Sequence, residues 1–540
     1  MSKDVGLDAV LQELGYFGKY NIVNYALLLF PVYLAGMYGS AFVFEASDIN
    51  YRCNITECEG VNNNTWLKHA IPLKDGELSK CKRYQHYNYT GSCSIGDFNT
   101  SVKEECHSFV YSDEDSAVKD FDLGCQNWKR TLVGSAHNAG LFLSLPLTGV
   151  ISDRYGRKLA LAVASLMNGV FGFLRSFSSS YIMMLVFEFL EAGLGAGAYS
   201  TAFVIAMELV GPKGRVFGNT LLNGVYVMGL ITLSALAWWL QSWRNLLRVI
   251  YIPAMFVISY YWILNESVRW LISKGRNTEA AAILKKAAKM NRVELSDEVL
   301  SPLYELEKLN TDTNNEKTKD ELECKVEEKT ESNFMKVIKS SIIRKRLVIC
   351  SFLWITCTFV YYGLSINSVS LAGNKYVNFM LVSFVEIPAN FVCLLVLDRF
   401  GRKKVLIITY VLSACLCIGL SFLPKDQKWL SLVLYLSGKF SITVAYSSVY
   451  IYVSEVFPTN VRQSLLAVCS SLGRVGSTLA PMTPLLNHYY HNLPAIFFGS
   501  MALVASILVF SLPETINVAL PDTVEEAERL SHSRSKKEPA

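Results

Sequence analysis

Two stretches, GVISDRYGRK at residues 149–158 and DRFGRKK at residues 398–404, decide how this chain of 540 residues is organised. Both contain the pattern D-R-x-G-R-K, and each is followed by a glutamate with an arginine seven positions further on, Glu208/Arg215 and Glu455/Arg462. The offsets agree, because 398 − 153 = 245 and 455 − 208 = 247. A third echo follows in Glu266 and Glu514, where 514 − 266 = 248. Ordered matches at nearly one offset predict a duplicated unit of about half the chain.

The composition is that of a membrane protein. The chain is 51% hydrophobic and 18% charged, whereas soluble domains carry about 25% charge, and the mean hydropathy is +0.27. A spanning helix needs about 20 apolar residues, and twelve runs qualify: 21–46, 131–151, 159–178, 181–210, 216–240, 245–264, 346–366, 374–397, 405–423, 429–454, 464–486 and 493–512. Together with the duplication, they predict an all-α membrane protein with two pseudo-symmetric six-helix bundles, the parallel-repeat pattern of a transporter.

The charges divide this plan into segments and orient it. We expect an N-terminal segment 1–20, a first bundle 21–264, a linker 265–345, a second bundle 346–512 and a tail 513–540. An even number of spans places both termini on one side, together with the basic clusters at 154–158, 213–215, 344–346 and 399–404. Because basic residues favour the cytosolic side, both termini are expected in the cytosol. The net charge of +5 is mild and indicates no nucleic-acid partner.

The polar stretch 47–129, between the first two runs, is expected to be an extracellular loop. It contains six cysteines, Cys53, Cys58, Cys81, Cys93, Cys106 and Cys125, and four N-x-S/T sites, Asn54, Asn63, Asn88 and Asn99. The cysteines predict a disulfide framework on an oxidising side, with fifteen possible pairings among which the sequence does not choose. Glycosylation at these sites would place the loop outside the cytosol, and we expect the protein in the plasma membrane. The cysteine spacings do not form paired C-x-x-C motifs, so a zinc site is not expected. The loop could also offer a surface for the formation of homo-oligomers.

The repeated turns are candidates for gating. The residues concerned are Asp153, Arg154, Arg157, Glu208 and Arg215 in the first half, and Asp398, Arg399, Arg402, Glu455 and Arg462 in the second. Charges at helix ends interact with neighbouring charges and with helix dipoles, so such pairs can latch one conformation and break in another. The alternative is that they mark topology and anchor helix ends only.

The same strings carry a specific resemblance. The doubled turn resembles the major facilitator superfamily. NESVRWLISKGR at 265–276 is similar to the P-E-S-P-R-W-L-x-x-x-G-R signature of solute carrier family 22, the organic cation, anion and zwitterion transporters, with Asn265 and Val268 in place of its two prolines. SEVFPTNVR at 454–462 resembles the family's E-L-Y-P-T-x-x-R, and the six-cysteine loop fits as well. The resemblance implies a transporter of small organic ions, closest to the carnitine and organic cation branch.

Charged side chains inside a span usually face a cavity or a partner. Those here are Arg175, Glu188, Glu191, Glu386, Lys439 and Arg474, together with the polar His137. The resemblance implies aspartate at the position of Arg474 in cation-selective members and arginine in anion and zwitterion members. A guanidinium there would hold a carboxylate; alternatively, Glu386 neutralises it and it never meets substrate.

The remaining substrate-binding candidates are Glu386, Tyr361, Tyr362, Lys439, Tyr446 and Glu191. Glu386 could hold an ammonium group or pair within its bundle, and the tyrosines could offer a cation–π surface or serve packing alone. Lys439 resembles a lysine carried by much of the family. Glu188 and Glu191 share one helix face, which suits proton or cation coupling or pairing with Arg175. His137 could titrate near neutral pH or be a hydrogen-bonded structural residue.

We therefore expect a twelve-helix secondary transporter that moves a small organic ion by alternating access, most of all a zwitterion such as carnitine. Organic anions and organic cations stay open, as does coupling to Na⁺ or H⁺ or exchange for another solute. No triad of Ser, His and Asp and no nucleotide-binding motif is present, so neither an enzyme nor a cofactor nor a metal site is expected. More distant alternatives are a sugar-type facilitator, whose cavity would be neutral and which would lack a six-cysteine first loop, and a non-transporting receptor. Measurable solute flux distinguishes a carrier from the receptor.

Overall fold

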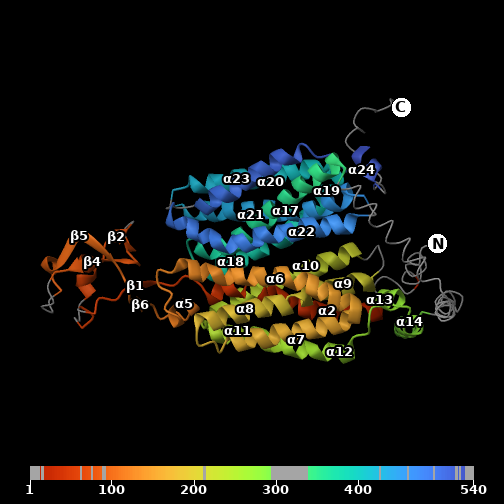
Figure 1. The fold of residues 1–540 in the computed structure, drawn as a ribbon, viewed down its shortest axis with the longest axis horizontal. Helices are drawn as coiled ribbons and strands as arrows, with labels where there is room; N and C mark the ends of the chain where they lie inside the picture. Colours follow the sequence, from red (N-terminus) through yellow and green to blue (C-terminus); the bar gives the residue numbers. More distant parts are fainter. Residues whose placement is uncertain are drawn as a thin grey trace.

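The computed structural model describes residues 18–56, 58–60, 64–74, 77–87, 93–210, 215–293, 339–424, 427–458, 461–490, 493–516 and 524–529, with Glu13 and Pro521. Its long helices form two bundles that lie side by side, one from each half of the chain (Figure 1). A small disulfide-bonded region projects from one end. We call this the loop end, and the opposite end, where the two D-R-x-G-R-K turns lie, the turn end.

The first bundle contains the helices of the first half. They are α2 (Lys19–Tyr38), α3 (Ala41–Glu45), α6 (Asn127–Tyr155), α7 (Arg157–Arg175), α8 (Tyr181–Gly195), α9 (Gly197–Leu209), α10 (Arg215–Leu240), α11 (Trp243–Phe256), the 3-10 turn Val257–Ser259 and α12 (Tyr260–Ile263). Short helices α13 (Val268–Ser273) and α14 (Asn277–Asn291) follow at the turn end.

The second bundle repeats this arrangement. It contains α17 (Ser341–Asn367), the 3-10 turn Ser368–Ser370, α18 (Lys375–Phe384), α19 (Glu386–Phe400), α20 (Arg402–Ser421), α21 (Lys428–Val456), α22 (Arg462–Leu479), the 3-10 segment η7 (Ala480–His488) and α23 (Leu493–Val509). Helix α24 (Val524–Arg529) packs against α17. The helices lie where the apolar runs predict them.

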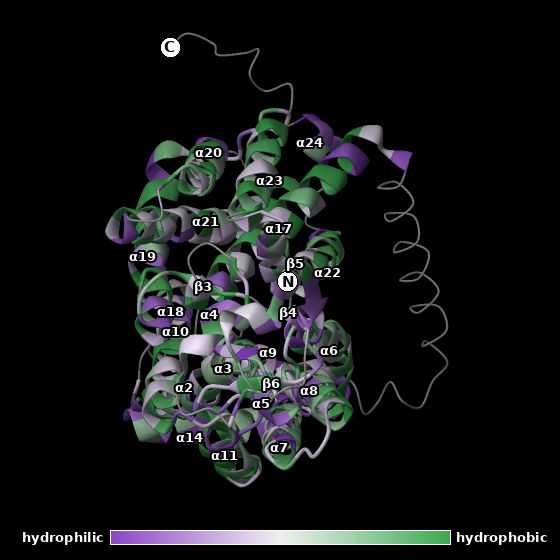
Figure 2. Ribbon diagram, turned by 90° about the vertical axis from the view of Figure 1, so that its left-hand side faces the viewer, coloured by the Kyte–Doolittle hydropathy of each residue, from purple (hydrophilic) through white to green (hydrophobic). Residues whose placement is uncertain are grey.

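Ten spans among the described residues are long and apolar enough to cross a membrane. The two predicted spans outside that set are α6, which is long but contains polar residues such as His137 and Asn138, and α23, which is apolar but has 17 residues. Figure 2 shows that apolar residues dominate the helices of both bundles. Large apolar side chains such as Trp239 and Phe422 are 79% and 81% exposed, as a surface in contact with lipid acyl chains requires.

Each bundle has its own apolar core. The bundles also touch, because Phe379 of α18 belongs to the core of the first bundle. Its ring lies edge-on against Phe44 of α3, with centroids 5.1 Å apart. Tyr376 of α18 stacks on Phe44 and on Trp238 of α10. The bundles are therefore joined by aromatic contacts near the loop end.

The disulfide-bonded region contains three antiparallel strand pairs. β1 (Tyr51–Cys53) pairs with β6 (Phe109–Tyr111), β2 (Leu73–Lys74) with β3 (Glu77–Leu78), and β4 (Lys82–His86) with β5 (Phe98–Glu105). Short helices α4 (Leu67–Ala70) and α5 (Ala117–Asp120) complete it. The disulfides are Cys53–Cys106, Cys58–Cys93 and Cys81–Cys125. The predicted framework is confirmed, and the structure selects one of the fifteen pairings.

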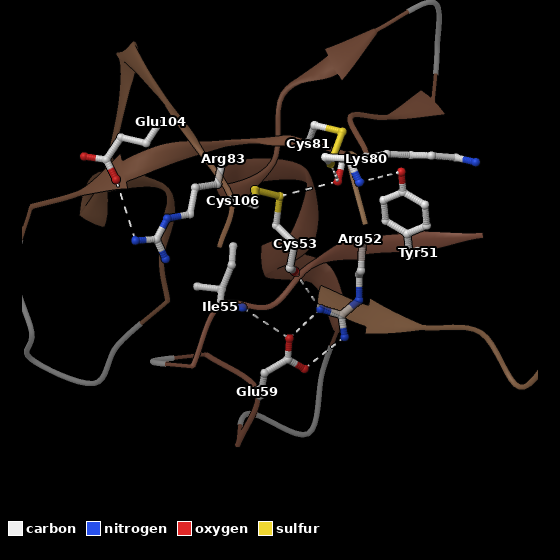
Figure 3. Close-up of a disulfide and its surroundings, with 11 residues drawn as sticks. Tyr51, Arg52, Cys53, Ile55, Glu59, Lys80, Cys81, Arg83, Glu104 and Cys106 are labelled. Atoms are coloured by element: carbon white, nitrogen blue, oxygen red, sulfur yellow. Dashed lines mark hydrogen bonds and ion pairs between the residues drawn. A yellow bond between two sulfur atoms is a disulfide. The ribbon is translucent and has the colours of Figure 1, made fainter. Parts of the chain in front are cut away.

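Beside the Cys53–Cys106 bond, Arg52 forms a two-pronged ion pair with Glu59 (Figure 3). The hydrogen bond from Arg52 holds the pKa of Glu59 below its ordinary value. Since the depressed pKa belongs to the folded loop, the stabilisation is present at neutral pH and is lost as the pH falls through that pKa.

Candidate transport site

Arg474 lies near the middle of the C-terminal bundle's span formed by α22 and η7, where that bundle faces the other. Helix α22 packs against α17 of its own bundle and against α6 of the first. The Arg474 side chain is half-buried and lies beside Tyr362 of α17. It is thus inside the molecule without being sealed by its neighbours.

Tyrosines from both bundles surround this guanidinium. Tyr362 and Tyr446 come from α17 and α21, whereas Tyr226 and Tyr199 come from α10 and α9 of the first bundle, and all four lie near Arg474. The two N-terminal rings lie 5.4 Å apart in an edge-on arrangement. All four side chains are half-buried. Aromatic faces of this kind attract an alkylammonium group.

Glu386 and Lys439 lie beside these rings but pair with each other. The Lys439 Nζ is 2.9 Å from Glu386 Oε1, and Tyr361 donates its hydroxyl hydrogen to Glu386 Oε2 over 2.6 Å. Lys439 also donates to Ser365 Oγ over 2.7 Å and lies 3.2 Å from the centre of the Tyr361 ring. Lys439 and Glu386 are 0% and 4% exposed, so this pair is sealed and balanced in charge.

The pairing answers a question that the sequence left open. Glu386 takes Lys439 as its partner, whereas Tyr362, a neutral group, lies beside Arg474. Tyr361 stacks on Tyr446 with ring centres 5.3 Å apart, so the sealed pair lies directly behind the aromatic wall. The accessible charge of the centre is therefore the guanidinium of Arg474, which favours a carboxylate in that position.

Glu191, also a substrate-binding candidate, lies in a different place. Its carboxylate is 1% exposed within the first bundle, near Arg175 and His137. The structure therefore groups it with buried charges of its own bundle and not with the tyrosines around Arg474.

At the turn end the two halves of the molecule repeat one geometry. Arg157 pairs with Asp153 and lies 3.7 Å from Glu208. In the second half, Arg402 pairs with Asp398 over 3.3 Å and with Glu455 over 3.2 Å.

Glu266 and Glu514, the third echo of the repeat, cap the helices that follow the turns. Glu266 accepts hydrogen bonds from the backbone N–H groups of Arg157 and Lys158, and Glu514 from those of Arg402 and Lys403. A carboxylate at a helix N-terminus satisfies free N–H groups and complements the helix dipole.

The glycine of each turn makes this cap possible. Gly156 and Gly401 have φ angles of 112° and 91°, a region that side chains disfavour. A Cβ at either position would also collide with the capping carboxylate of Glu266 or Glu514.

The other gating candidates have simpler surroundings. Arg154 and Arg399 are exposed and lie over the rings of Tyr155 and Phe400. Arg462 donates to the carbonyl oxygen of Phe457. The side chain of Arg215 lies outside the described residues.

At the loop end, polar contacts tie the two bundles together. Lys375 of α18 pairs with Glu114 of the disulfide-bonded region over 2.7 Å. Ser234 of α10 donates to the carbonyl oxygen of Tyr376 over 2.9 Å, and Ser135 of α6 donates to that of Thr478 over 3.1 Å. These contacts must break if the bundles separate at this end.

Comparison with known proteins places this geometry in a family. The sequence pattern "Sugar (and other) transporter" matches residues 81–527. The organic cation transporter protein of Drosophila melanogaster is 31% identical over 545 residues, covering 99% of this chain and 97% of the relative. The human organic cation/carnitine transporter 2 is 30% identical and covers 99% and 96%, and human solute carrier family 22 member 2 is 33% identical and covers 91% and 87%. The chain belongs to solute carrier family 22.

Solved structures agree on the fold. A partially occluded inward-open structure of the xylose transporter XylE from E. coli matches with a TM-score of 0.58 at 16% identity, covering 91% of this chain and 99% of that one. The major facilitator fold predicted from the doubled turn is thereby confirmed, as is the family predicted from the signature strings. As a member of solute carrier family 22, the chain is a multi-pass membrane transporter and not an enzyme.

Three residues that the structure places in these buried groups were not among the candidates taken from the sequence. Tyr199 and Tyr226 are two of 28 tyrosines and lie in ordinary apolar spans, so no sequence feature distinguishes them. Glu45 did have one: it is an acid in the last turn of the first apolar run, and the structure buries it fully beside Arg175.

Proposed function

We propose that this transporter carries a zwitterion that combines a carboxylate with an alkylammonium group, as carnitine does. The observation that carries the proposal is the half-buried guanidinium of Arg474, which has neutral tyrosines rather than an acid as neighbours. The substrate carboxylate would accept two hydrogen bonds from it. The ammonium group would lie against the faces of Tyr199, Tyr226 and Tyr446.

The two bundles would deliver this cargo by alternating access. Tyr199 and Tyr226 belong to one bundle and Arg474 to the other, so a bound zwitterion would contact both. The contacts at the loop end would break on one side of the cycle, and the paired networks around Arg157 and Arg402 would rearrange on the other. This assigns gating to the ten turn-end residues predicted from the repeat.

The orientation proposed is the loop end outside and the turn end in the cytosol. The three disulfides of the loop region suit an oxidising compartment, which supports the plasma membrane. Asn54 and Asn99 lie in that region, and Asn63 and Asn88 lie outside the described residues. Glycosylation at these four sites, a coupling ion or an exchanged solute, and self-association through the loop belong to the same proposal.

Uptake by expressing cells tests the cargo. Labelled carnitine, tetraethylammonium and a dicarboxylate are compared in the wild type and in Arg474→Lys, Arg474→Gln and Arg474→Asp, with surface protein measured in parallel. Arg276→Gln serves as the control, because that arginine is exposed and pairs with Glu279.

We expect carnitine uptake to exceed that of the other two solutes and to fall by about tenfold or more in Arg474→Gln, since a hydrogen bond to a charged group contributes about 1.5–3 kcal/mol. Arg474→Asp should shift the preference toward tetraethylammonium. An unchanged order of preference in Arg474→Asp would contradict the assignment. Wild-type preference for tetraethylammonium would instead assign organic cations, the cargo in the names of the relatives from fly and human.

A further inference from the structure

A second group of buried charges lies in the first bundle, apart from Arg474. We call it the acid cluster and define it as Glu45 of α3, His137 of α6, Arg175 of α7, and Glu188 and Glu191 of α8. Each of these side chains is at most 3% exposed. Arg175 pairs with Glu188 and lies 3.4 Å from Glu45 and 3.7 Å from Glu191. His137 Nδ1 lies 2.9 Å from Glu188 Oε1 and 3.5 Å from Glu191 Oε2.

The charges of the acid cluster do not balance. Three carboxylates face one permanent cation, which leaves −2 with a neutral imidazole and −1 with a protonated one. An uncompensated buried charge costs several kcal/mol. The closed protein therefore needs at least one further positive charge in this place.

The hydrogen bonds are incomplete at the same atoms. Both oxygens of Glu45, both oxygens of Glu191 and Nε2 of His137 are buried without a hydrogen-bond partner. Buried polar atoms normally have one. The unpartnered carboxylate oxygens are thus where a missing proton would be bound.

The remaining polar neighbours do not supply the charge. Tyr251 of α11 accepts a hydrogen bond from Arg175 Nη2 over 3.1 Å, and Tyr38 of α2 stacks on Tyr251 and lies near Glu191. Arg248 of α11 donates to Ser176 Oγ, next to Arg175 in sequence. The tyrosines are neutral, and Arg248 contacts the Ser176 hydroxyl, the Asn245 amide and the Phe177 ring.

A proton fits this place better than a metal ion. His137, Glu188 and Glu191 offer ligand atoms that lie within 4.8 Å of one another. However, Arg175 already pairs with Glu188 and lies within 4 Å of Glu191, so a divalent ion would meet a fixed positive charge. A proton needs no coordination shell and neutralises one carboxylate in place.

The acid cluster lies directly behind the contacts that close the loop end. Ser135, two residues before His137 on α6, donates to Thr478 of α22. Phe44, the residue before Glu45, packs on Tyr376 and Phe379 of α18. The ring of Phe42 lies 5.5 Å from that of His137. Separation of the bundles at this end would therefore move both His137 and Glu45 and admit water to them.

We propose that the acid cluster is a proton-binding site whose occupancy favours closure of the loop end. The closed state buries the cluster and must retain the proton, whereas the open state hydrates the carboxylates and releases it. Low pH therefore stabilises the closed state, and high pH the open one. The proposal rests on the two-bundle transport cycle but not on the identity of the cargo.

The test measures closure directly, with no solute present. Spin labels are attached at Asp113→Cys and Ala372→Cys, which are exposed positions near the Glu114–Lys375 pair, after Cys324 and Cys415 are replaced by serine. The distance between the labels is recorded in the full-length protein in lipid nanodiscs from about pH 8 to about pH 5.5. In this range histidine and buried carboxyl groups can titrate. Glu191→Gln and Glu45→Gln are compared with Glu104→Gln, an acid of the disulfide-bonded loop.

We expect the ratio of closed to open molecules to rise by up to about tenfold for each unit of falling pH, the limit for one proton bound only in the closed state. Glu191→Gln should remain closed at every pH, and Glu45→Gln should lose much of the response. Glu104→Gln should behave as the wild type. A pH-independent distance in the wild type, or a full pH response in Glu191→Gln, would overturn the proposal.

Two further arms separate the proton from other ligands. Closure that follows Na⁺ at constant pH, when Na⁺ replaces K⁺, would assign a metal cation and overturn the proton. Loss of closure on addition of a chelator would assign a divalent ion and likewise overturn the proton. Failure of carnitine uptake with an intact pH response would leave this site standing and refute only the proposed cargo.

Discussion

The two halves of this transporter both bury ionic groups, but they do so in opposite ways. In the second bundle, Glu386 and Lys439 form a pair in which both carboxylate oxygens and the ammonium group are hydrogen-bonded. In the first bundle, three acids share Arg175, and several of their atoms have no hydrogen bond. A complete pair is fixed in charge, whereas an incomplete cluster must exchange a proton when its surroundings change.

The buried charges differ between the two halves, whereas the turns of the duplicated unit are alike. The turns after α6 and α19 keep the same glycine, the same arginine and the same capping glutamate, Glu266 or Glu514. The shared parts are those that any two rocking bundles need. The unshared parts lie deeper in the membrane, where we assign cargo selection to the second half and proton binding to the first.

The largest effect is expected from removal of Arg175. Arg175→Met leaves three buried carboxylates with no guanidinium, and loss of one partner of a buried pair costs about 3–5 kcal/mol. We expect a strongly lowered melting temperature in detergent, which no single Glu→Gln change in the cluster restores fully. Protonated carboxyl groups carry no charge and are less costly to bury, so acid pH should restore part of the lost melting temperature. An Arg175→Met protein as stable as the wild type at neutral pH would mean that the carboxyl groups of the cluster are already protonated and need no guanidinium.

Removal of Lys439 should lower the stability by a similar amount, but a second substitution at Glu386 should restore most of it. Lys439→Met leaves Glu386 alone in a sealed site, so we again expect a loss of about 3–5 kcal/mol. The double change Lys439→Met with Glu386→Gln removes both charges and should return to within about 1–2 kcal/mol of the wild type. Melting temperatures of the four proteins in this cycle measure the coupling. A double variant no better than Lys439→Met would contradict the balanced-pair description.

The helix caps should behave equally in the two halves. Glu266→Ala and Glu514→Ala each remove the acceptor for backbone N–H groups at the start of α7 or α20, and loss of such a cap costs about 1 kcal/mol. Thermal unfolding measures both, with Glu279→Ala as the control, since its side chain is 52% exposed and pairs with Arg276. Clearly unequal losses would mean that the duplicated turns no longer have equivalent roles.

Much of this architecture could be predicted from the sequence. Span lengths follow from hydropathy, and the repeat fixes which turns correspond, because both are local patterns. The cap formed by Glu266 at Arg157 was visible as an echo in the repeat but not as a contact. Its meaning requires two segments 109 residues apart to meet.

The partners in the site could not be predicted in this way. The sequence offered Glu386 as the neutralising group for Arg474, yet α19 faces α21 and brings Lys439 to that carboxylate instead. Which helices face each other depends on tertiary packing, and the periodicity of apolar residues does not identify the neighbour of a helix. The sequence left the disulfide pairing open for a related reason, since the pairing follows from strands such as β1 and β6 that are distant in sequence.

The smallest effect on stability, and a test of gating, comes from the first residue of each turn. Asp153 and Asp398 have side chains that are 74% and 81% exposed, and exposed ion pairs contribute about 0–1 kcal/mol. Asp153→Asn and Asp398→Asn should therefore leave the melting temperature nearly unchanged. If the networks latch one conformation, however, both variants should lower the initial uptake rate per surface molecule, and by similar factors, because Arg157 and Arg402 lose equivalent partners. Normal rates in both would remove the gating role and leave these charges as anchors of the helix ends. A defect in one alone would mean that the two halves diverged here too, as they did around Arg175 and Lys439.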